Sequence, residues 1–218
     1  MLTLFISGSD TGIGKTRVVA ALARIALAHS SRSVQIVKPV QSGGEMSDAD
    51  LAARLAGLPP QCAHTLQHFH APLAPVAAAA AEGAVFRPAD FPAQLAKIPR
   101  ADLRLVEGSG GLAVPLVPQG ADWTAYSTVF AADAVILVVA DRLGAINQAR
   151  LVHEYFLPRN SKKIPHGIFL NALVPPPPDV SASTRSALAA CGIPIWGELA
   201  ADSLDPVLHP PLAQLLGL

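Results

Sequence analysis

The chain has 218 residues, and its 16 Lys and Arg balance its 16 Asp and Glu. A hydrophobic content of 51% excludes a disordered chain, and zero net charge without a basic cluster argues against a protein that binds nucleic acid or anionic membranes by bulk charge. The length suits one domain, which we expect to span residues 1–218.

The sequence gives no sign of secretion or membrane insertion. Cys62 and Cys191 are far apart and outside any CxxC motif, so they do not indicate a disulfide framework. The longest apolar run, Ala134–Ala140, falls far short of the roughly 20 residues of a membrane span. Leu2–Ser7 is too short for the core of a signal peptide. We therefore expect a soluble, cytoplasmic protein.

Short apolar runs alternate with Ala- and Leu-rich stretches of helical spacing along the whole chain. Runs without polar alternation are typical of strands buried on both faces, as in a parallel sheet. The predicted strands are Leu2–Ser7, Ser33–Lys38, Leu103–Glu107, Ala134–Ala140, Gly167–Asn171 and Ile193–Gly197. The predicted helices are Lys15–His29, Asp48–Leu55, Ala89–Ala96, Trp123–Ala131, Ile146–Phe156 and Ala182–Ala190. This alternation predicts a single-domain α/β fold with a mostly parallel, doubly wound sheet flanked by helices.

A glycine-rich phosphate loop follows the first predicted strand and opens the first helix. Residues 8–16 read GSDTGIGKT, in which Lys15 and Thr16 are the residues expected to reach phosphates and Mg²⁺. Glycines let backbone amides turn inward around phosphate oxygens, and a helix N-terminus adds partial positive charge. The loop departs from the common Walker A spacing, since five residues rather than four separate Gly8 from Gly14. A plain glycine turn is the alternative, but GKT between a strand and a helix favours phosphate binding.

A second lysine ends the second predicted strand. Lys38 is followed by Pro39, which we expect to stop the strand, and by a glycine-containing loop. A lysine at the end of a central strand suggests a bound anion, and Lys15 and Lys38 would together form a positive cradle. Taken alone, Lys38 is better explained as a strand-end lysine that reaches solvent.

Two carboxylates are candidates for a metal site. Glu107 ends a buried strand, where a carboxylate needs a partner and where P-loop proteins typically place an acid that serves Mg²⁺. Asp48 has a simpler explanation as an acid in a helix start capped by Ser47. Thr16, Asp48 and Glu107 would suit Mg²⁺, which prefers few carboxylates together with phosphate oxygens and water.

Three weaker signals are left. His64, His68 and His70 are interpreted as loop histidines, for which metal binding is not expected, because nearby prolines argue against a helix. The segment 143–147, LGAIN, is equally consistent with an ordinary helix entry or with exposed amides that bind a carboxylate. Pro175–Pro178 is expected to be a stiff surface loop.

These motifs occur in the order found in one family of enzymes. GSDTGIGKT at 8–16, KPVQSG at 38–43, EGSGG at 107–111 and LGAIN at 143–147, with Asn171 and Gly197-Glu198, strongly resemble the dethiobiotin synthetases over essentially the full length. The five-residue spacing in the phosphate loop is characteristic of this family. The resemblance implies a P-loop NTPase-like fold and a homodimer. It also implies that the enzyme uses ATP, Mg²⁺, CO₂ and 7,8-diaminononanoate (7,8-diaminopelargonate) to form dethiobiotin through a carbamate and a carbamic–phosphoric anhydride.

The resemblance also implies a role for individual residues. Lys38 and Lys15 would be catalytic, and Thr16, Asp48 and Glu107 would hold the metal. The substrate would contact Thr11 and Ser42, and its distal carboxylate would bind to the partner subunit's segment made of Gly144, Ala145, Ile146 and Asn147. ATP would contact Gly12, Ile13, Gly14, Lys15, Thr16, Arg17, Asp48, Glu107, Gly108, Ser109, Gly110, Asn171, Leu199, Ala200 and Ala201, with Asn171 at the adenine edge.

Two other functions share this kind of P-loop. An amide-forming ligase of the cobyrinate diamide synthase type usually carries a glutaminase domain with a catalytic cysteine, for which this chain has neither room nor a suitable cysteine. A partitioning or septum-site ATPase has a signature lysine five residues before the P-loop lysine, where this chain has Asp10. We therefore expect a dethiobiotin synthetase rather than either alternative.

Overall fold

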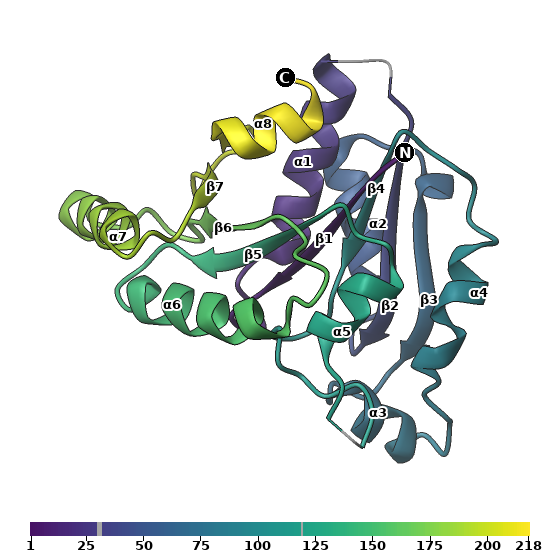
Figure 1. Ribbon diagram of the computed structural model, residues 1–218. Helices are drawn as coiled ribbons and strands as arrows, with labels where there is room; N and C mark the ends of the chain where they lie inside the picture. Colours follow the sequence, from purple (N-terminus) through teal and green to yellow (C-terminus); the bar gives the residue numbers. More distant parts are fainter. Residues whose placement is uncertain (30–31, 119) are drawn as a thin grey trace.

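The structure is a computed structural model that describes residues 1–29, 32–118 and 120–218. Its core is one sheet with the strand order β3-β2-β4-β1-β5-β6-β7-β8 (Figure 1). All neighbouring strands are parallel except β7 and β8, which are antiparallel. The strands are β1 (Leu2–Gly8), β2 (Val34–Ser42), β3 (Ala63–Phe69), β4 (Leu103–Glu107), β5 (Ala134–Ala140), β6 (His166–Asn171), β7 (Ile195–Leu199) and β8 (Val207–Leu208).

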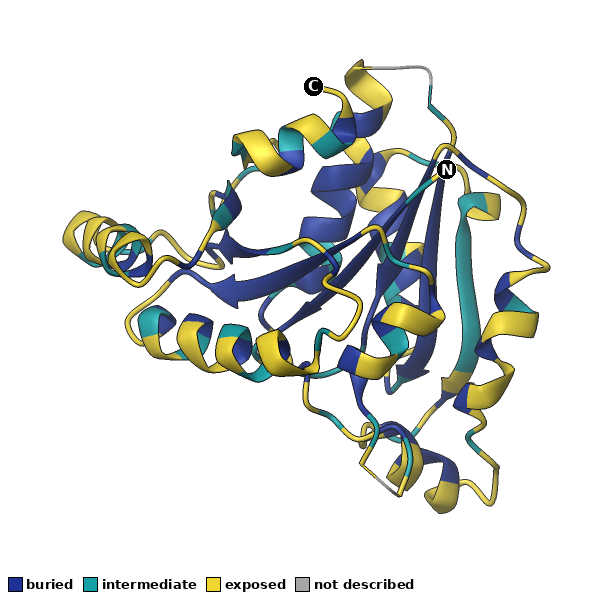
Figure 2. Ribbon diagram, in the orientation of Figure 1, coloured by how far each residue is buried: buried dark blue, intermediate teal, exposed yellow. Residues whose placement is uncertain are grey.

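Helices cover both faces of the sheet, so that its central strands are buried (Figures 1 and 2). One face packs against α1 (Lys15–His29), α2 (Asp48–Ala56) and α8 (Pro210–Leu216). The other packs against α3 (Pro75–Ala81), α4 (Phe91–Leu95), α5 (Trp123–Val129), α6 (Ala145–Phe156) and α7 (Pro178–Ala190). The predicted mostly parallel, doubly wound α/β fold is confirmed.

Small side chains allow the first face to pack closely. Buried alanines of α1 and α2 lie against the sheet, including Ala20, Ala23, Ala49 and Ala52. Alanine has the highest helix propensity and loses no side-chain entropy on burial. The other face instead contains an aromatic cluster around Phe5, Phe91, Trp123 and Phe130. The low aromatic content is therefore concentrated on one side of the sheet.

The second strand is longer than predicted. β2 continues through Pro39 to Ser42, and Val40 and Ser42 pair with residues of β3. The expectation that Pro39 would end the strand was wrong, because β3 pairs with β2 on both sides of the proline in a parallel ladder. The extension carries Gln41 and Ser42 to the edge where the phosphate loop lies.

Four elements were not predicted: β3, β8, α3 and α8. β3 is an edge strand whose residues are mostly half-buried, so it lacks a continuous apolar run. His64 and His68 lie on β3, which corrects their assignment to a loop. Pro178 is the first residue of α7, so the loop expected at Pro175–Pro178 ends one residue earlier. Proline is well suited to the first turn of a helix, because the amide it lacks would have no helical partner there.

Candidate functional site

The phosphate loop connects the carboxyl end of β1 to the N-terminus of α1 in a backbone conformation that requires glycine. Gly12 and Gly14 have φ angles of 72° and 81°. A Cβ atom on Gly14 would lie 2.2 Å from Asn171 Nδ2, and one on Gly8 would lie 2.5 Å from the carbonyl oxygen of Val138. The glycines therefore provide both the left-handed turns and the close approach of the loop to β5 and β6.

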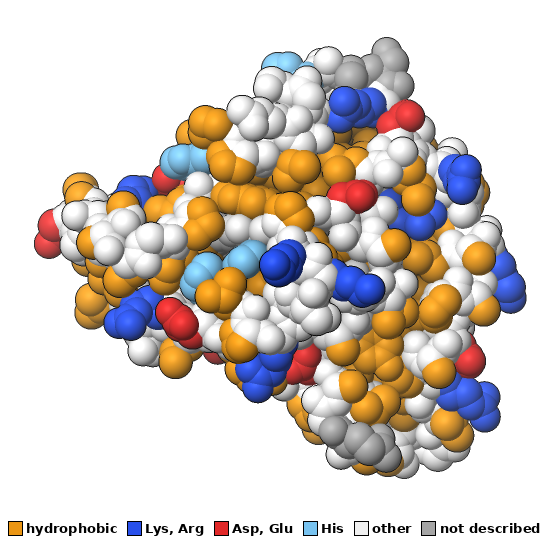
Figure 3. Space-filling model, in the orientation of Figure 1, with side chains coloured by type: hydrophobic (Ala, Val, Ile, Leu, Met, Phe, Trp, Pro, Cys, Tyr) orange, Lys and Arg blue, Asp and Glu red, His pale blue; other side chains and the backbone are white. Residues whose placement is uncertain are grey.

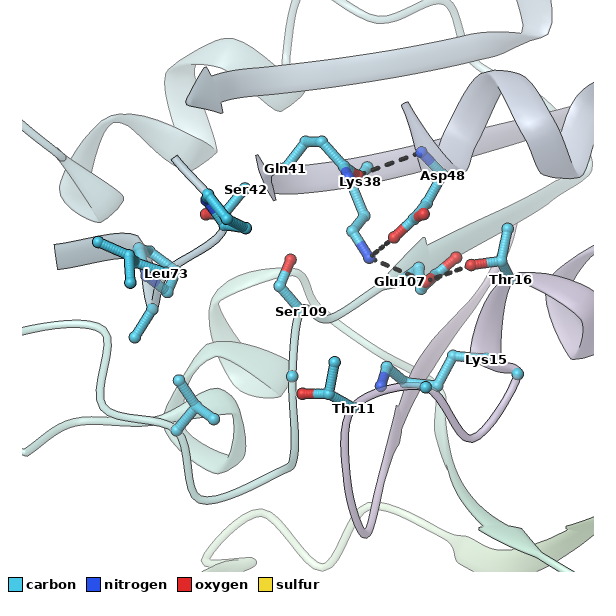
Figure 4. Close-up of a pocket in the computed structure, with 17 residues that line it drawn as sticks. Thr11, Lys15, Thr16, Lys38, Gln41, Ser42, Asp48, Leu73, Glu107 and Ser109 are labelled. Atoms are coloured by element: carbon cyan, nitrogen blue, oxygen red, sulfur yellow. Dashed lines mark hydrogen bonds and ion pairs between the residues drawn. The ribbon is translucent and has the colours of Figure 1, made fainter. Parts of the chain in front are cut away.

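Lys38 is held between two carboxylates at the edge of the phosphate loop (Figure 4). Its Nζ atom lies 2.5 Å from Asp48 Oδ2 and 2.8 Å from Glu107 Oε1. The hydroxyl of Thr16 donates to the same Glu107 oxygen at 3.0 Å. Residues from β2, α2, β4 and α1 thus meet at one point, which brings together the predicted second lysine and the three predicted metal ligands.

Lys38 and Glu107 are almost completely removed from solvent, whereas the Asp48 side chain is 32% exposed. Lys38 is 2% exposed and Glu107 is 1% exposed. Burial lowers the pKa of Lys38, but the neighbouring Glu107 and Asp48 carboxylates outweigh burial and leave that pKa above its usual value. Burial raises the pKa of Glu107, whereas Lys38 opposes this change. Lys38 therefore stays charged and compensates the buried Glu107 together with the partly exposed Asp48.

Lys15 points into the same region from the start of α1. Its Nζ donates to the carbonyl oxygen of Asp10 at 2.8 Å, so the side chain folds back over the loop. Burial, and then the charge of Lys38, lower the pKa of Lys15 to about 8. An anion bound in the loop would relieve the repulsion between the two lysines.

A cavity of about 720 Å³ opens above these residues. This volume is within the range of small-molecule sites. Its lining brings together eleven residues predicted from sequence: Thr11, Gly12, Gly14, Lys15, Thr16, Lys38, Ser42, Asp48, Glu107, Ser109 and Gly110. Two buried oxygens of these lining residues, Ser42 Oγ and Glu107 Oε2, have no hydrogen-bond partner. Both atoms belong to residues that line the cavity, and neither is satisfied within the protein.

The sequence reasoning missed one polar side chain of this cavity, Gln41. Its amide oxygen accepts from the backbone amide of Asp48 at 3.1 Å, and its amide nitrogen donates to the carbonyl oxygen of Gly43 at 3.0 Å. Gln41 therefore fixes the short loop that places Asp48 beside Lys38. The position of Gln41 inside the KPVQSG motif could have identified it from sequence. Its hydrogen bond to the Asp48 amide, seven residues away, follows only from the fold.

An apolar wall, also missed from sequence, faces the lysines across the cavity. It consists of Pro72, Leu73, Ala74, Pro75 and Val114. The segment 72–75 leads into α3 and lies near the glycine turn after β2, where a Cβ atom on Gly43 would be 3.0 Å from the Pro72 side chain. The cavity thus combines a charged end with an apolar side, which suits a ligand with a charged group on a hydrocarbon chain.

The loop after β4 is anchored on both sides. The hydroxyl of Ser109 donates to the carbonyl oxygen of Val40, and the indole N–H of Trp123 donates to the carbonyl oxygen of Ser109 at 2.6 Å. Gly108 fits against the rings of Trp123 and Phe5, where a Cβ atom would be 3.2 Å from the indole. The packing holds Glu107 at the base of the cavity.

A second group of predicted residues lies away from this cavity, around the side chain of Arg17. Its guanidinium donates to Asn171 Oδ1 at 3.0 Å, and to the carbonyl oxygens of Ala172, Ala200, Ala201 and Ser203. Asn171 is fully buried and also donates from Nδ2 to the carbonyl oxygen of Ile13 at 2.7 Å. The predicted roles of Ile13, Arg17, Gly108, Asn171, Leu199, Ala200 and Ala201 in ATP binding remain predictions.

The segment from Gly144 to Asn147 does not line the large cavity. Gly144 has a φ of 94° and precedes the first turn of α6. Ala145, the first residue of that helix, is buried. Asn147 is exposed. A separate cavity of about 560 Å³ lies between α6 and the phosphate loop, with Gln148, Leu151 and Tyr155 on the helix side.

The sequence also led to expectations about metal binding by histidines, membrane spans and basic surface patches. Among residues 1–29, 32–118 and 120–218, no group of three or more His, Cys, Asp or Glu side chains has an arrangement suited to a metal ion. Within the same ranges, no helix has both the length and the apolar character needed to cross a bilayer. On the face in Figure 3, Lys and Arg side chains are scattered rather than gathered into one patch.

The fold is shared with P-loop ATPases of partitioning and septum-site systems. A plasmid partition protein from Borrelia burgdorferi has a TM-score of 0.61 at 10% identity, and the match covers 99% of this chain and 96% of the partition protein. A MinC:MinD cell division protein complex from Aquifex aeolicus has a TM-score of 0.53 at 14% identity, and the match covers 99% of this chain and 85% of the other. At such identities the likeness shows the fold alone.

Sequence comparison is more specific. The model of an AAA domain family matches residues 2–204. An ATP-dependent dethiobiotin synthetase of Mycobacterium tuberculosis is 38% identical over 193 residues, which is 87% of this chain and 83% of the relative. The corresponding protein of Mycobacterium avium is 37% identical over 199 residues, with the same shares. The chain therefore belongs to the ATP-dependent dethiobiotin synthetase family.

Proposed function

We propose that this protein is an ATP-dependent dethiobiotin synthetase, a ligase that forms the C–N bonds of a cyclic urea. The observation that supports this most directly is the buried Lys38 amine, held between Glu107 and Asp48 beside the P-loop Lys15. In a partitioning-type switch the second lysine lies within the P-loop, where this chain has Asp10, whereas Lys38 comes from β2. An enzyme that gathers a labile anion and a phosphate has a use for both.

The proposed reaction has three steps. One amine of 7,8-diaminononanoate adds to CO₂, loses a proton and becomes a carbamate. A carbamate oxygen attacks the γ-phosphorus of ATP, and the bond to ADP breaks, which leaves a carbamic–phosphoric anhydride. The second amine attacks the carbonyl carbon, loses a proton and expels phosphate, closing the five-membered ring. Because that closure is intramolecular, correct positioning supplies much of its rate.

Lys15 and Lys38 would stabilise the negative charge of the phosphates and the carbamate in these steps. Lys15 would reach the β- and γ-phosphates from the loop. Lys38 would stabilise the carbamate and the charge of the transferring phosphoryl group, because it stays cationic in a site shielded from water. Thr11 and Ser42 would contact the diamine, and the unpartnered Ser42 hydroxyl is consistent with that role. The apolar wall around Leu73 would pack against its hydrocarbon chain.

Thr16, Asp48 and Glu107 would hold Mg²⁺. They fit that ion, because two carboxylates and a hydroxyl converge and Glu107 Oε2 is buried without a partner. When bound, Mg²⁺ would neutralise phosphate charge. Lys38 contacts the same two carboxylates, so its charge would add to that of the ion at this end of the cavity.

The proposal includes a homodimer in which the start of α6 completes the partner's site. Gly144, Ala145, Ile146 and Asn147 would present amides and a polar side chain to the distal carboxylate of the substrate. Leu143 and Leu151, at the start and on the outer face of α6, are 81% and 64% exposed. Exposed apolar side chains beside a second cavity support an interface at this helix. A cytoplasmic location and a single domain remain predictions.

A partitioning-type ATPase has the same fold but is less well supported. The position of its signature lysine is occupied by Asp10, whose carboxylate accepts from the amide of Thr11 at 2.7 Å. An acid at that position would repel rather than stabilise a nucleotide phosphate.

The decisive test follows labelled bicarbonate into dethiobiotin with purified protein, 7,8-diaminononanoate, ATP and Mg²⁺. The expected result is incorporation that requires all four reactants, with one ADP and one phosphate per product. Failure of folded protein to incorporate label would contradict the proposal. ATP hydrolysis that does not depend on the diamine would instead favour the ATPase alternative.

A further inference from the structure

Arg104 is buried and has no counter-ion among the residues that the structure describes. It lies on β4 and is 6% exposed, and its Nε atom is enclosed without a hydrogen-bond partner. Throughout residues 1–29, 32–118 and 120–218, its guanidinium donates no hydrogen bond and contacts no carboxylate. Burial of a cation is costly unless an opposite charge or a set of acceptors compensates it. The described part of the chain provides neither.

Two polar side chains flank Arg104 on the same face of the sheet. Arg104 pairs with Thr3 of β1 on one side and with Gln35 of β2 on the other, and both neighbours are buried. Each of the three lies two positions before a strand residue of the core under helices α3 to α7, and residues two apart on a strand point to the same face. Each is also the second residue of its strand. They therefore form a row at the amino ends of β2, β4 and β1, near the label N in Figure 1.

The row has many hydrogen-bond donors and few acceptors. Gln35 Oε1 accepts from His64 Nε2 at 2.5 Å, and the amide nitrogen of Gln35 makes no bond to a described residue. The Thr3 hydroxyl is likewise unpaired within the described chain. The five N–H groups of the Arg104 guanidinium can only donate. A ligand that fits this row must therefore accept hydrogen bonds, as the oxygen atoms of an anion do.

The charges near Arg104 have the same sign as its own. Burial, and then the charge of Arg100, lower the pKa of Arg104. Burial, and then the charge of Arg104, lower the pKa of His64. An anion bound between these groups would reverse the electrostatic part of both shifts.

The acids just before β4 and β5 are bonded to other groups. Asp102 accepts from the amide and the hydroxyl of Ser33, at 2.9 and 2.8 Å. Asp133 accepts from the backbone amide of Thr3 at 2.7 Å. Both acids are exposed, and neither contacts Arg104. Compensation for the Arg104 charge therefore has to come from a ligand.

The row is separate from the phosphate loop. Arg104 lies near the amino end of β4, whereas Glu107 of the proposed metal site is the last residue of the same strand. Three residues of extended strand span about 10 Å, and residues three apart point to opposite faces of a sheet. Arg104 also does not line the cavity beside Lys38. An anion bound here would thus be additional to the phosphates of a nucleotide.

We propose that Arg104, Thr3 and Gln35 form a second oxyanion site at the amino edge of the sheet, which binds a small anion of the phosphate or carboxylate class. The planar guanidinium matches two oxygens of such an anion in parallel hydrogen bonds. The hydroxyl and the amide on either side donate to its remaining lone pairs. The proposal is independent of the proposed function, because none of the three residues is assigned to ATP, Mg²⁺ or the diamine.

The test measures binding of inorganic phosphate to the full chain by calorimetry, after a non-hydrolysable ATP analogue and Mg²⁺ have filled the phosphate loop. We expect about one phosphate per chain with a dissociation constant below about 1 mM, since a few charge-assisted hydrogen bonds suffice for that affinity. Arg104→Met should weaken binding by more than about tenfold. Arg104→Lys keeps the charge without the planar fork and should weaken it by about threefold or more. Arg87→Met is the matched control, since that side chain is exposed and has no partner among the described residues.

Thermal melts show whether each variant is folded. Without phosphate, Arg104→Met should melt no lower than the wild-type protein, because it removes a buried charge that lacks compensation. With the ATP analogue present, phosphate should raise the melting temperature of the wild-type protein and of Arg87→Met, but not that of Arg104→Met.

Acetate and chloride distinguish the ligand classes. Acetate that displaces phosphate at a similar concentration would support a carboxylate as the ligand, and acetate that does not would support a phosphate. Displacement by chloride at the same concentration would overturn the proposal, because charge alone would then explain binding. Absence of phosphate binding to the wild-type protein, or equal binding to Arg104→Met, would also overturn it. Dethiobiotin formation tests the proposed function separately, since none of these measurements contains the diamine.

Discussion

Lys38 provides the sharpest prediction for a single residue. Its buried amine contacts Asp48 and Glu107, so Lys38→Gln removes the charge that would act on the carbamate and leaves two acids facing each other. We expect turnover to fall by more than about 100-fold, as for loss of other electrostatic groups in active sites. ADP should still bind within about threefold of the wild-type affinity, because the phosphate loop is intact.

The same variant should become dependent on metal for stability. Breaking a buried pair by removal of one partner costs about 3–5 kcal/mol, and a divalent cation bound to the two acids should restore part of that loss. Thermal melts with Mg²⁺ and with a chelator measure the difference. Lys162→Gln, at an exposed lysine, is the control. Unchanged turnover in Lys38→Gln would remove Lys38 from the reaction.

Gln41 leads to a separate prediction about positioning. Its amide holds the backbone of Asp48, so Gln41→Ala should weaken Mg²⁺ activation by about tenfold while kcat at saturating Mg²⁺ changes little. The measurement is a titration of activity against Mg²⁺. Gln67→Ala removes a glutamine of β3 that bonds to Arg87 instead, and should leave the titration unchanged. Equal effects of both substitutions would contradict the proposed role of Asp48.

The difference between Lys38 and Arg17 shows how far single residues were predictable. Lys15, Lys38 and Glu107 end or follow apolar runs, and the carboxyl ends of parallel strands meet at one edge, so their convergence follows from sequence. Arg17 is also beside the phosphate loop in sequence. Its side chain, however, bonds to residues more than 150 positions away, and no local pattern contains that information.

At the scale of elements, the N-cap of α2 connects stability to the proposed metal site. Ser47 Oγ accepts from the amides of Ala49 and Asp50 and from the Thr65 hydroxyl, at 3.1, 3.3 and 2.6 Å. Ser47→Ala should lower the free energy of unfolding by about 1–2 kcal/mol, because the cap is lost and the half-buried Thr65 hydroxyl loses its acceptor. Urea unfolding measures this change.

Ser183→Ala is the matched control, since that serine is exposed on α7 and bonds only to the carbonyl oxygen of Val180. It should change the free energy of unfolding by less than about 0.5 kcal/mol. Asp48 lies in the first turn of α2, so the loss of the cap should also weaken Mg²⁺ activation. Equal unfolding midpoints for the two variants would show that the cap adds nothing.

Central strands were easier to predict than the edge of the sheet. β5 is buried along its whole length, so its sequence is a continuous apolar run. β3 has one covered face and contains His, Thr and Gln, and it becomes a strand because β2 offers a full-length partner. α3 and α8 begin with prolines that resemble loop signals in sequence. Element type was therefore predictable where burial was symmetric, and not where tertiary pairing decided it.

At the scale of the whole molecule, a pair of histidines makes stability depend on pH. His153 of α6 and His166 of β6 have ring centroids 5.1 Å apart, and one buried nitrogen of each has no partner. Burial lowers the pKa of both from the ordinary 6.5, even though Glu154 opposes the shift at His153 and a backbone hydrogen bond opposes it at His166. The folded state therefore favours neutral rings.

The sign of the effect follows from this preference. The stabilisation is complete above pH about 6.5, and it is lost as the pH falls through that value, because the unfolded chain then takes up protons that the folded chain excludes. Urea unfolding at pH 8 and pH 5.5 should show a smaller loss for a His153→Gln, His166→Gln double variant than for the wild-type protein. An identical loss would assign the acid sensitivity to other groups.

The proposed dimer makes the last prediction, because a composite site can be reconstituted from two defective chains. Lys38→Gln damages a site through its own subunit, whereas Asn147→Asp would repel the substrate carboxylate in the partner's site. Each should be inactive alone. After unfolding and refolding as an equal mixture, half of the dimers pair unlike chains, and each of these has one intact site. About a quarter of the wild-type activity should return.

Interface variants test the same arrangement by another route. Leu151→Lys should shift sedimentation toward the monomer and raise KM for the diamine by more than about tenfold, while ADP binding stays unchanged. Val85→Lys is a matched control, because both side chains are 64% exposed and Val85 lies far from α6 in sequence. No recovery of activity in the mixture, together with an active monomeric Leu151→Lys, would place the whole site within one chain. Recovery would mean that α6 completes the cavity of a second copy, and that the large cavity beside Lys38 contains only part of the diamine site.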